Sequence, residues 1–195
     1  MSYALSAYLV SQGQILQFPG CDDSRLLRRS LKAAKRRLRE LDVELGDEDD
    51  EDDITHEQAF RELFSGQMTS PGYGHRYGWA FETLCAYLGE PLSNEAFSPC
   101  NGDWYEELDE FLAASNVALK LSNLVENCPI SIPMSDDWPM IGHLSQGEIR
   151  STAQQISQLA ASTSDSEFGD ALTTVSAWFQ RASKDNDLII VGFHG

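Results

Sequence analysis

The stretch His75–Cys100, HRYGWAFETLCAYLGEPLSNEAFSPC, is the segment around which we expect the rest of the chain to pack. Its apolar residues recur at intervals of three and four, a spacing that places them on one face of a helix. These residues are Tyr77, Ala80, Phe81, Leu84, Cys85 and Leu88. We expect the helix to end at Gly89, because a residue without a Cβ atom adopts the left-handed conformation at little cost.

The length and composition are typical of one globular domain over residues 1–195. The chain has 195 residues, of which 42% are apolar and 10% are aromatic, and this length can hold a core without disulfides or a metal ion. The four cysteines are scattered and form no CxxC pair, which indicates free thiols in a reducing cytoplasm. No apolar run approaches the ~20 residues that cross a bilayer, and the first residues lack the features of a signal peptide.

The net charge of −17 narrows the classes of partner. Residues 42–53 include nine acidic residues and no basic one, and within them the low-complexity run 46–53 (GDEDDEDD) predicts a mobile acidic loop. A field of this sign repels phosphate backbones and anionic lipid, so we expect no nucleic acid and no membrane as partner. It favours a basic protein, and the alternative interpretation is that the charge serves solubility alone.

A long helix is predicted before the acidic run. Asp22, Asp23 and Ser24 offer side chains that accept the unpaired N–H groups of a first turn, and a leucine-rich stripe then extends from Leu27 to Leu45. The other faces carry eight of the chain's 14 basic residues. A basic helix indicates nucleic acid or another anionic partner. The acidic run can neutralise it, however, and late cations suit the helix dipole, so we interpret these faces as solvated. Dimerisation through the stripe is a further hypothesis, which leaves a monomer or a weak dimer open.

The remaining patterns predict an α+β fold, predominantly helical, packed on a small mixed β-sheet. The apolar runs 3–10, 117–121 and 188–193 predict its three strands. Capping boxes at 55–58 and 145–148 predict the starts of two further helices, and we expect Gly66 to end the first of them. Another helix is expected from Asn101–Asp103 onward, with acidic side chains facing the solvent. These acidic residues are Glu106, Glu107, Asp109 and Glu110.

The candidate binding pocket lies at the start of the central helix, where unpaired N–H groups favour an anion. It comprises His75, Arg76, Tyr77, Trp104, Asp136, Asp137 and Trp138. In this pocket His75 is a candidate base that Asp136 would orient. The alternative interpretation is a histidine that caps the helix or lies at the edge of the core, since no nucleophile motif accompanies it.

Other chemistries have little support in the sequence. No histidines or cysteines are paired at metal-ligand spacing, so we expect no metal, and the glycines form neither a Walker motif nor a dinucleotide fingerprint, so we expect no cofactor. The leading hypothesis is therefore a non-enzymatic binding or interaction protein, for example one that neutralises a basic protein as an acidic immunity protein does. The alternative is a small hydrolase or ligand-binding enzyme that uses His75, Tyr77 and Asp136.

Several stretches resemble known bacterial families. LSQGEIRSTAQQISQL and FGDALTTVSAWFQRASKDNDLIIVGF resemble the closing region of the YfbM-like family. MSYALSAYLV, GHRYGWAFETLCAYLG, AFSPCNGDWYEELD and SDDWPMIGHLS resemble a related group of bacterial domains of unknown function. The resemblance covers most of the chain outside residues 20–65. It implies an α+β fold and a bacterial, cytoplasmic protein, and it implies no reaction.

Overall fold

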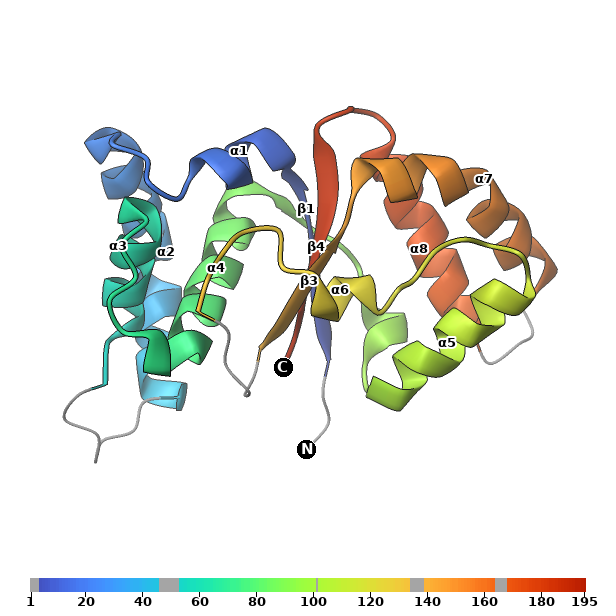
Figure 1. Ribbon diagram of the computed structural model, residues 1–195, viewed down its shortest axis with the longest axis horizontal. Helices are drawn as coiled ribbons and strands as arrows, with labels where there is room; N and C mark the ends of the chain where they lie inside the picture. Colours follow the sequence, from blue (N-terminus) through green and yellow to red (C-terminus); the bar gives the residue numbers. More distant parts are fainter. Residues whose placement is uncertain (1–3, 46–52, 101, 134–138, 164–167) are drawn as a thin grey trace.

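The elements of the chain are arranged around an antiparallel sheet with the strand order β2-β1-β4-β3 (Figure 1). The computed structural model describes residues 4–45, 53–100, 102–133, 139–163 and 168–195. Within these ranges the strands are β1 (Leu5–Ser11), β2 (Glu90–Pro91), β3 (Met140–Leu144) and β4 (Leu188–His194). The predicted α+β class with predominant helix is confirmed, but the prediction of a mixed sheet is wrong, because each described strand pair is antiparallel.

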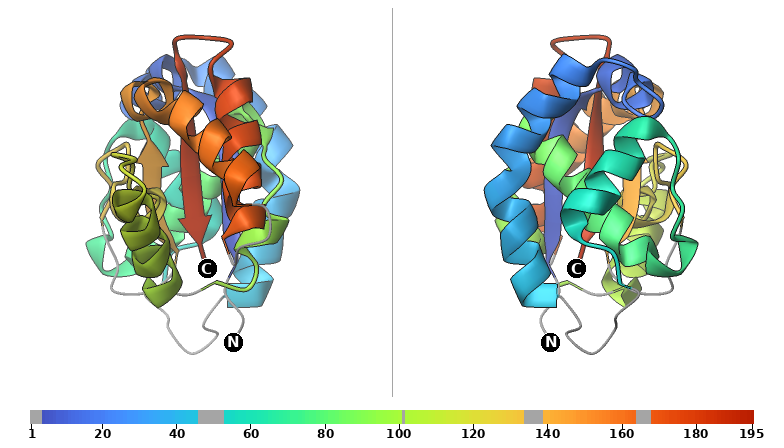
Figure 2. Two further views of the ribbon diagram at one scale, coloured as in Figure 1. Left: turned by 90° about the vertical axis from the view of Figure 1, so that its right-hand side faces the viewer. Right: turned by 90° about the vertical axis from the view of Figure 1, so that its left-hand side faces the viewer.

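Helices cover both faces of the sheet, which gives three layers (Figures 1 and 2). The first helical layer consists of α2 (Ser24–Leu45), α3 (His56–Ser65) and α4 (Gly74–Leu88). The second helical layer consists of α5 (Gly102–Ala114), α6 (Asn123–Glu126), α7 (Gln146–Ser162) and α8 (Gly169–Ala182). The short α1 (Gln12–Gln17) follows β1 directly and extends from its end on the side of the first helical layer (Figure 1).

The two central strands are apolar on both sides because a helical layer covers each face. In β1, Leu5 and Leu9 contribute to the core under the second layer, whereas Val10 contributes to the core under the first. In β4, Ile190 contributes to the core under the second layer and Val191 to the core under the first. Burial on both faces explains why these strands read as nearly continuous apolar runs and not as alternating ones.

The predicted helix starts are confirmed, because they depend on local capping. Asp23 Oδ1 accepts from two backbone N–H groups at the start of α2, at 2.8 and 3.1 Å. Thr55 Oγ1 accepts from the N–H three residues later, at 3.1 Å, and begins α3. Ser145 and Glu148 form a complete capping box at the start of α7. Gly66 ends α3 with a φ of 71°, a conformation that glycine adopts without strain.

Gly89 ends α4 for a different reason from the one that the sequence indicated. Its φ of −116° and ψ of −166° are extended, so the predicted left-handed conformation is wrong. A Cβ atom at this position would lie 2.4 Å from Val10 Cγ1 and 2.5 Å from Leu9 O. Gly89 is therefore required by the close approach of the chain to β1.

The predicted middle strand at 117–121 is wrong. Val117, Leu119 and Leu121 are buried in alternation, which imitates a strand, but the segment pairs with no described strand and its last N–H group bonds to the side chain of Asp109. Asp109 Oδ1 accepts from Leu121 N at 2.5 Å, and its Oδ2 accepts from the next backbone N–H at 3.4 Å. The segment is thus attached to α5 by a side chain and does not join the sheet.

The strand that pairs with β4 in its place is β3, which contains a glycine opposite another glycine. Gly142 and Gly192 are partners in the register, and Cβ atoms on them would lie 2.0 Å from Asn123 O and 2.5 Å from Leu124 O. The absence of side chains at this pair lets the backbone of α6 lie directly on the sheet. Gly142 also weakens the strand pattern of β3 in the sequence.

The leucine stripe of α2 faces the other helices of its own layer. Leu31, Ala34 and Leu38 are buried and belong to the core that α2 shares with α3 and α4. Leu45, at the end of the stripe, is 41% exposed. Most of the surface that we considered for dimerisation is therefore covered within one chain, and the oligomeric state stays a prediction.

Candidate functional site

Arg76, from the predicted pocket, lies at the centre of a buried polar network. Its side chain is 2% exposed. It donates from Nε to Asp53 Oδ1 at 3.1 Å and from Nη2 to Asp53 Oδ2, and its Nη1 lies 3.1 Å from His56 Nδ1. Asp53 is the one residue of the predicted acidic loop 46–53 that belongs to the described ranges.

His56 extends this network to the end of α2. Asp42 Oδ1 accepts from His56 N at 2.8 Å and lies 2.8 Å from His56 Nδ1. The imidazole is fully buried, and its Nε2 has no hydrogen-bond partner among the described residues. Burial lowers the pKa of His56, while the hydrogen bond and the charge of Asp42 oppose that shift. The network joins α2, α3 and α4, which gives Arg76 a structural role.

Tyr77 is also bonded within the first layer. It is fully buried, donates from Oη to Glu62 Oε2 at 2.5 Å and accepts from Ser70 N at 3.1 Å. Burial acts to raise the pKa of Glu62, but hydrogen bonds from Tyr77, Gln58 and Thr69 outweigh it and lower that pKa to about 2. Tyr77 therefore anchors the segment between α3 and α4.

The other predicted pocket residues do not all join this region. His75 is half-buried beside Tyr73, with ring centroids 6.3 Å apart. Trp104 lies in the second layer, where its ring meets Phe97 at 5.3 Å and Phe168 at 6.1 Å. The sheet thus separates Trp104 from His75, Arg76 and Tyr77 (Figure 1). The remaining candidates, Asp136, Asp137 and Trp138, lie outside the described residues.

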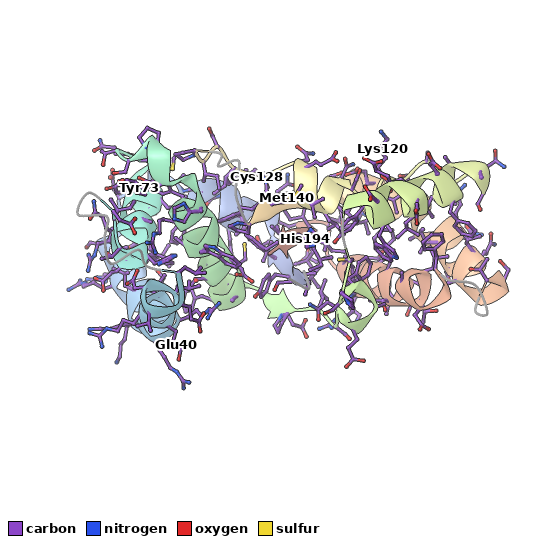
Figure 3. All side chains as sticks on the ribbon, turned by 90° about the horizontal axis from the view of Figure 1, so that it is seen from below. Glu40, Tyr73, Lys120, Cys128, Met140 and His194 are labelled. Carbon is purple, nitrogen blue, oxygen red and sulfur yellow. The ribbon has the colours of Figure 1, made fainter. Side chains whose placement is uncertain are left out.

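A thiol, a phenol and an imidazole meet in the core of the second layer, which the sequence did not indicate. Cys100 Sγ lies 3.5 Å from Tyr105 Oη and 3.8 Å from His194 Nε2. His194 is the last residue of β4 and is labelled in Figure 3. All three residues are buried. Burial raises the pKa of Cys100 and lowers that of His194. Both groups are therefore held neutral, whereas a nucleophilic cysteine requires a thiolate.

The surface feature that best suits a binding role is an acidic groove beside α5. Its volume is about 440 Å³. We call it the acidic groove and define it by its lining residues. These are Glu106, Asp109, Glu110, Ala113, Lys120, Ser122 and Glu126. Four carboxylates and one ammonium group thus line a hollow on the outer side of the second layer.

The walls of the acidic groove are held in place by local structure. Asn116 has a φ of 59° and turns the chain back after α5, a conformation that asparagine tolerates. The returning segment is fixed by Val117 N, which donates to Leu112 O at 2.9 Å, and by the two hydrogen bonds to Asp109. With Asp109 occupied, Glu106, Glu110 and Glu126 are the exposed carboxylates that face the groove.

The described ranges contain no helix with the length and apolar character of a membrane span. In the same ranges, no group of three or more His, Cys, Asp and Glu side chains is arranged to hold a metal ion. Cys21, Cys85, Cys100 and Cys128 are all free thiols, as the sequence indicated.

Comparison with known proteins gives a family and no activity. No match was found among the curated proteins or among the solved structures. The sequence model of one family, described as a domain of unknown function (DUF7691), matches residues 1–195. The chain therefore belongs to the DUF7691 family.

Proposed function

We propose that this chain is a non-enzymatic binding protein that receives a basic protein in the acidic groove. The observation that carries this proposal is the convergence of Glu106, Glu110 and Glu126 from two segments on one hollow. Carboxylates placed this way attract cations and discriminate against acidic partners. The surrounding sequence has the same sign, with 14 acidic and four basic residues from 101 to 195.

A groove of about 440 Å³ has room for one or two long basic side chains of a partner. Lysine or arginine would place its apolar stem against Ala113 and its charged end among the carboxylates. Neutralisation of a basic toxin would be one form of this function. We place the protein in a bacterial cytoplasm, in line with its four free thiols and with the resemblance to the YfbM-like family, which stays a prediction.

The alternative function, a small hydrolase at His75, Tyr77 and Asp136, has less support. Tyr77 is buried and its hydroxyl is bonded to Glu62. The neighbouring Arg76 is bonded to Asp53. Neither side chain is available to a substrate in this arrangement.

The test is binding of a labelled 12-residue lysine-rich peptide, measured by fluorescence anisotropy at low and high salt. The variant Glu106→Gln/Glu110→Gln/Glu126→Gln should bind about tenfold more weakly, since each exposed charge pair contributes roughly 0.2–1 kcal/mol. The matched control Asp22→Asn/Glu95→Gln/Asp170→Asn removes three exposed charges outside the groove. An equal loss in both triple variants would show attraction by net charge alone and would refute the proposed groove.

A further inference from the structure

Helix α2 carries a concentration of positive charge that the proposed function does not use. Its basic residues are Arg25, Arg28, Arg29, Lys32, Lys35, Arg36, Arg37 and Arg39. Arg36 pairs with Glu40 at 2.7 Å, and Arg37 pairs with Glu44 at 3.1 Å. Within the described ranges the other six form no ion pair, and all eight are exposed.

The order of charges along α2 is unfavourable for the helix itself. Basic residues begin at Arg25 in the first turn, where the helix dipole is positive, and no basic residue lies in the last turn. Acidic Glu40, Asp42 and Glu44 occupy the C-terminal end, where the dipole favours cations. The expectation that these cations suit the dipole is therefore wrong. Charges that lower the stability of their own helix are expected where the surface of that helix has a function.

Four of the bases form a straight row on one face of α2. Arg28, Lys32, Lys35 and Arg39 follow the spacing of four, three and four that aligns side chains along a helix. We call these four residues the cationic row. One open hollow of about 620 Å³, lined by α2 side chains alone, lies beside Lys32, Lys35 and Arg39, and Glu40 and Glu44 also line it. Another of about 260 Å³ lies between Arg28 and α3. Both hollows are lined by Lys32 and Lys35, so the row borders each of them.

We propose that the cationic row is a docking surface for a short acidic segment of a partner protein. The row spans about 16 Å, the length of 11 residues of helix. Carboxylates lie beyond both ends of the row. Asp22 and Asp23 precede it, and Glu40 and Glu44 follow it. A long polyanion such as a nucleic acid strand would meet these carboxylates wherever it continued past the row. A short segment can place its last carboxylate before Glu40 and continue with an uncharged residue.

Val43 supports a polypeptide as the occupant. Its side chain is 86% exposed and lines the larger hollow beyond Arg39. An apolar residue next to a group of cations can accept an apolar side chain of a peptide, whereas a phosphate backbone has no group that would use it. Charge complementarity and this apolar contact together define the chemistry of the partner: acidic side chains followed by a hydrophobic one.

The direct test uses two labelled probes of similar charge, a 12-residue peptide rich in Glu and Asp that ends in leucine, and a 12-nucleotide single-stranded DNA. The full chain should bind the peptide saturably and more tightly than the DNA, with an affinity that falls as salt rises. The variant Lys32→Ala/Lys35→Ala/Arg39→Ala should bind the peptide about tenfold more weakly, the loss expected for three exposed charge pairs.

A matched control removes three bases that lie outside both the cationic row and the acidic groove: Arg150→Ala/Arg181→Ala/Lys184→Ala. It should change peptide affinity less than twofold. Alanine is favourable in exposed helix positions, so α2 should stay folded; circular dichroism checks this, and a Gln triple variant replaces the Ala variant if helix content falls. Equal losses in the row and control variants, tighter binding of the DNA, or no saturable peptide binding would each overturn the proposal.

Discussion

Replacing Arg76 by alanine should destabilise the protein far more than removing an arginine from a surface ion pair. Arg76 is 2% exposed, and its partner Asp53 is 12% exposed in its side chain. The replacement leaves Asp53 without its two guanidinium hydrogen bonds and removes the contact to His56. Breaking a buried ion pair costs roughly 3–5 kcal/mol.

The expected loss is at the lower end, about 3 kcal/mol, because the small exposure of Asp53 lets water solvate part of the orphaned charge. The matched control is Arg181→Ala. Arg181 pairs with Glu90, but its side chain is 36% exposed and that of Glu90 is 62% exposed. Pairs of this kind contribute about 0–1 kcal/mol. The two variants therefore separate burial from the mere presence of an ion pair.

Urea unfolding followed by circular dichroism measures both losses. With a slope of about 2–3 kcal/mol per molar urea, the Arg76→Ala midpoint should fall by about 1 M and the Arg181→Ala midpoint by much less. Adding Asp53→Asn to Arg76→Ala should recover part of the loss, because the orphaned charge is removed. If Arg76→Ala costs no more than Arg181→Ala, or if Asp53→Asn brings no recovery, the assignment of the network as a structural connection is refuted.

Two further outcomes test the packing and the charges of the first layer. Stability should fall as the pH drops below about 6.5, because burial lowers the pKa of His56 in the folded state and the unfolded chain then binds more protons. In urea midpoints measured from pH 8 to 5, His56→Gln should reduce the dependence of stability on pH. Part of the dependence should remain, because burial also lowers the pKa of His194. An unchanged dependence would contradict the role of His56. Gly89→Ala should cost about 2 kcal/mol through the clash with β1, whereas Gly72→Ala, with no atom within 4 Å of the added Cβ, should stay within about 0.5 kcal/mol; similar values for the two in thermal unfolding would count against the clash.

The features that the sequence predicted correctly are those that neighbouring residues determine. The capping side chains Asp23, Thr55 and Ser145 act on N–H groups two or three residues away, so a short stretch contains the whole interaction. The same holds for the end of α3 at Gly66. Such signals do not depend on how the layers pack.

The features that the sequence did not predict depend on contacts between distant segments. Gly142 weakens the pattern of β3, and it is required only because α6 lies on the sheet at that point. The segment 117–121 resembles a strand because its apolar residues are buried in alternation, but Asp109, from another element, attaches it to α5. The candidate pocket grouped Trp104 with His75 although the sheet lies between them, since periodicity does not specify which face of a sheet a helix covers.

The two charged surfaces should act independently, although the chain as a whole is strongly acidic. The cationic row lies on α2 in the first layer and the acidic groove on α5 in the second, and Figure 3 shows Glu40 of α2 and Lys120 of the groove on opposite sides of the sheet. The sheet lies between the two layers, so they are farther apart than two directly packed helices, whose axes are about 8–10 Å apart, and this separation exceeds the Debye length of about 8 Å at physiological salt. The net charge of −17 therefore does not describe the cationic row. A partner meets the local charge of the helix that it approaches, so neutralising the groove should leave peptide binding at the row unchanged, and removing the row should leave the groove unchanged.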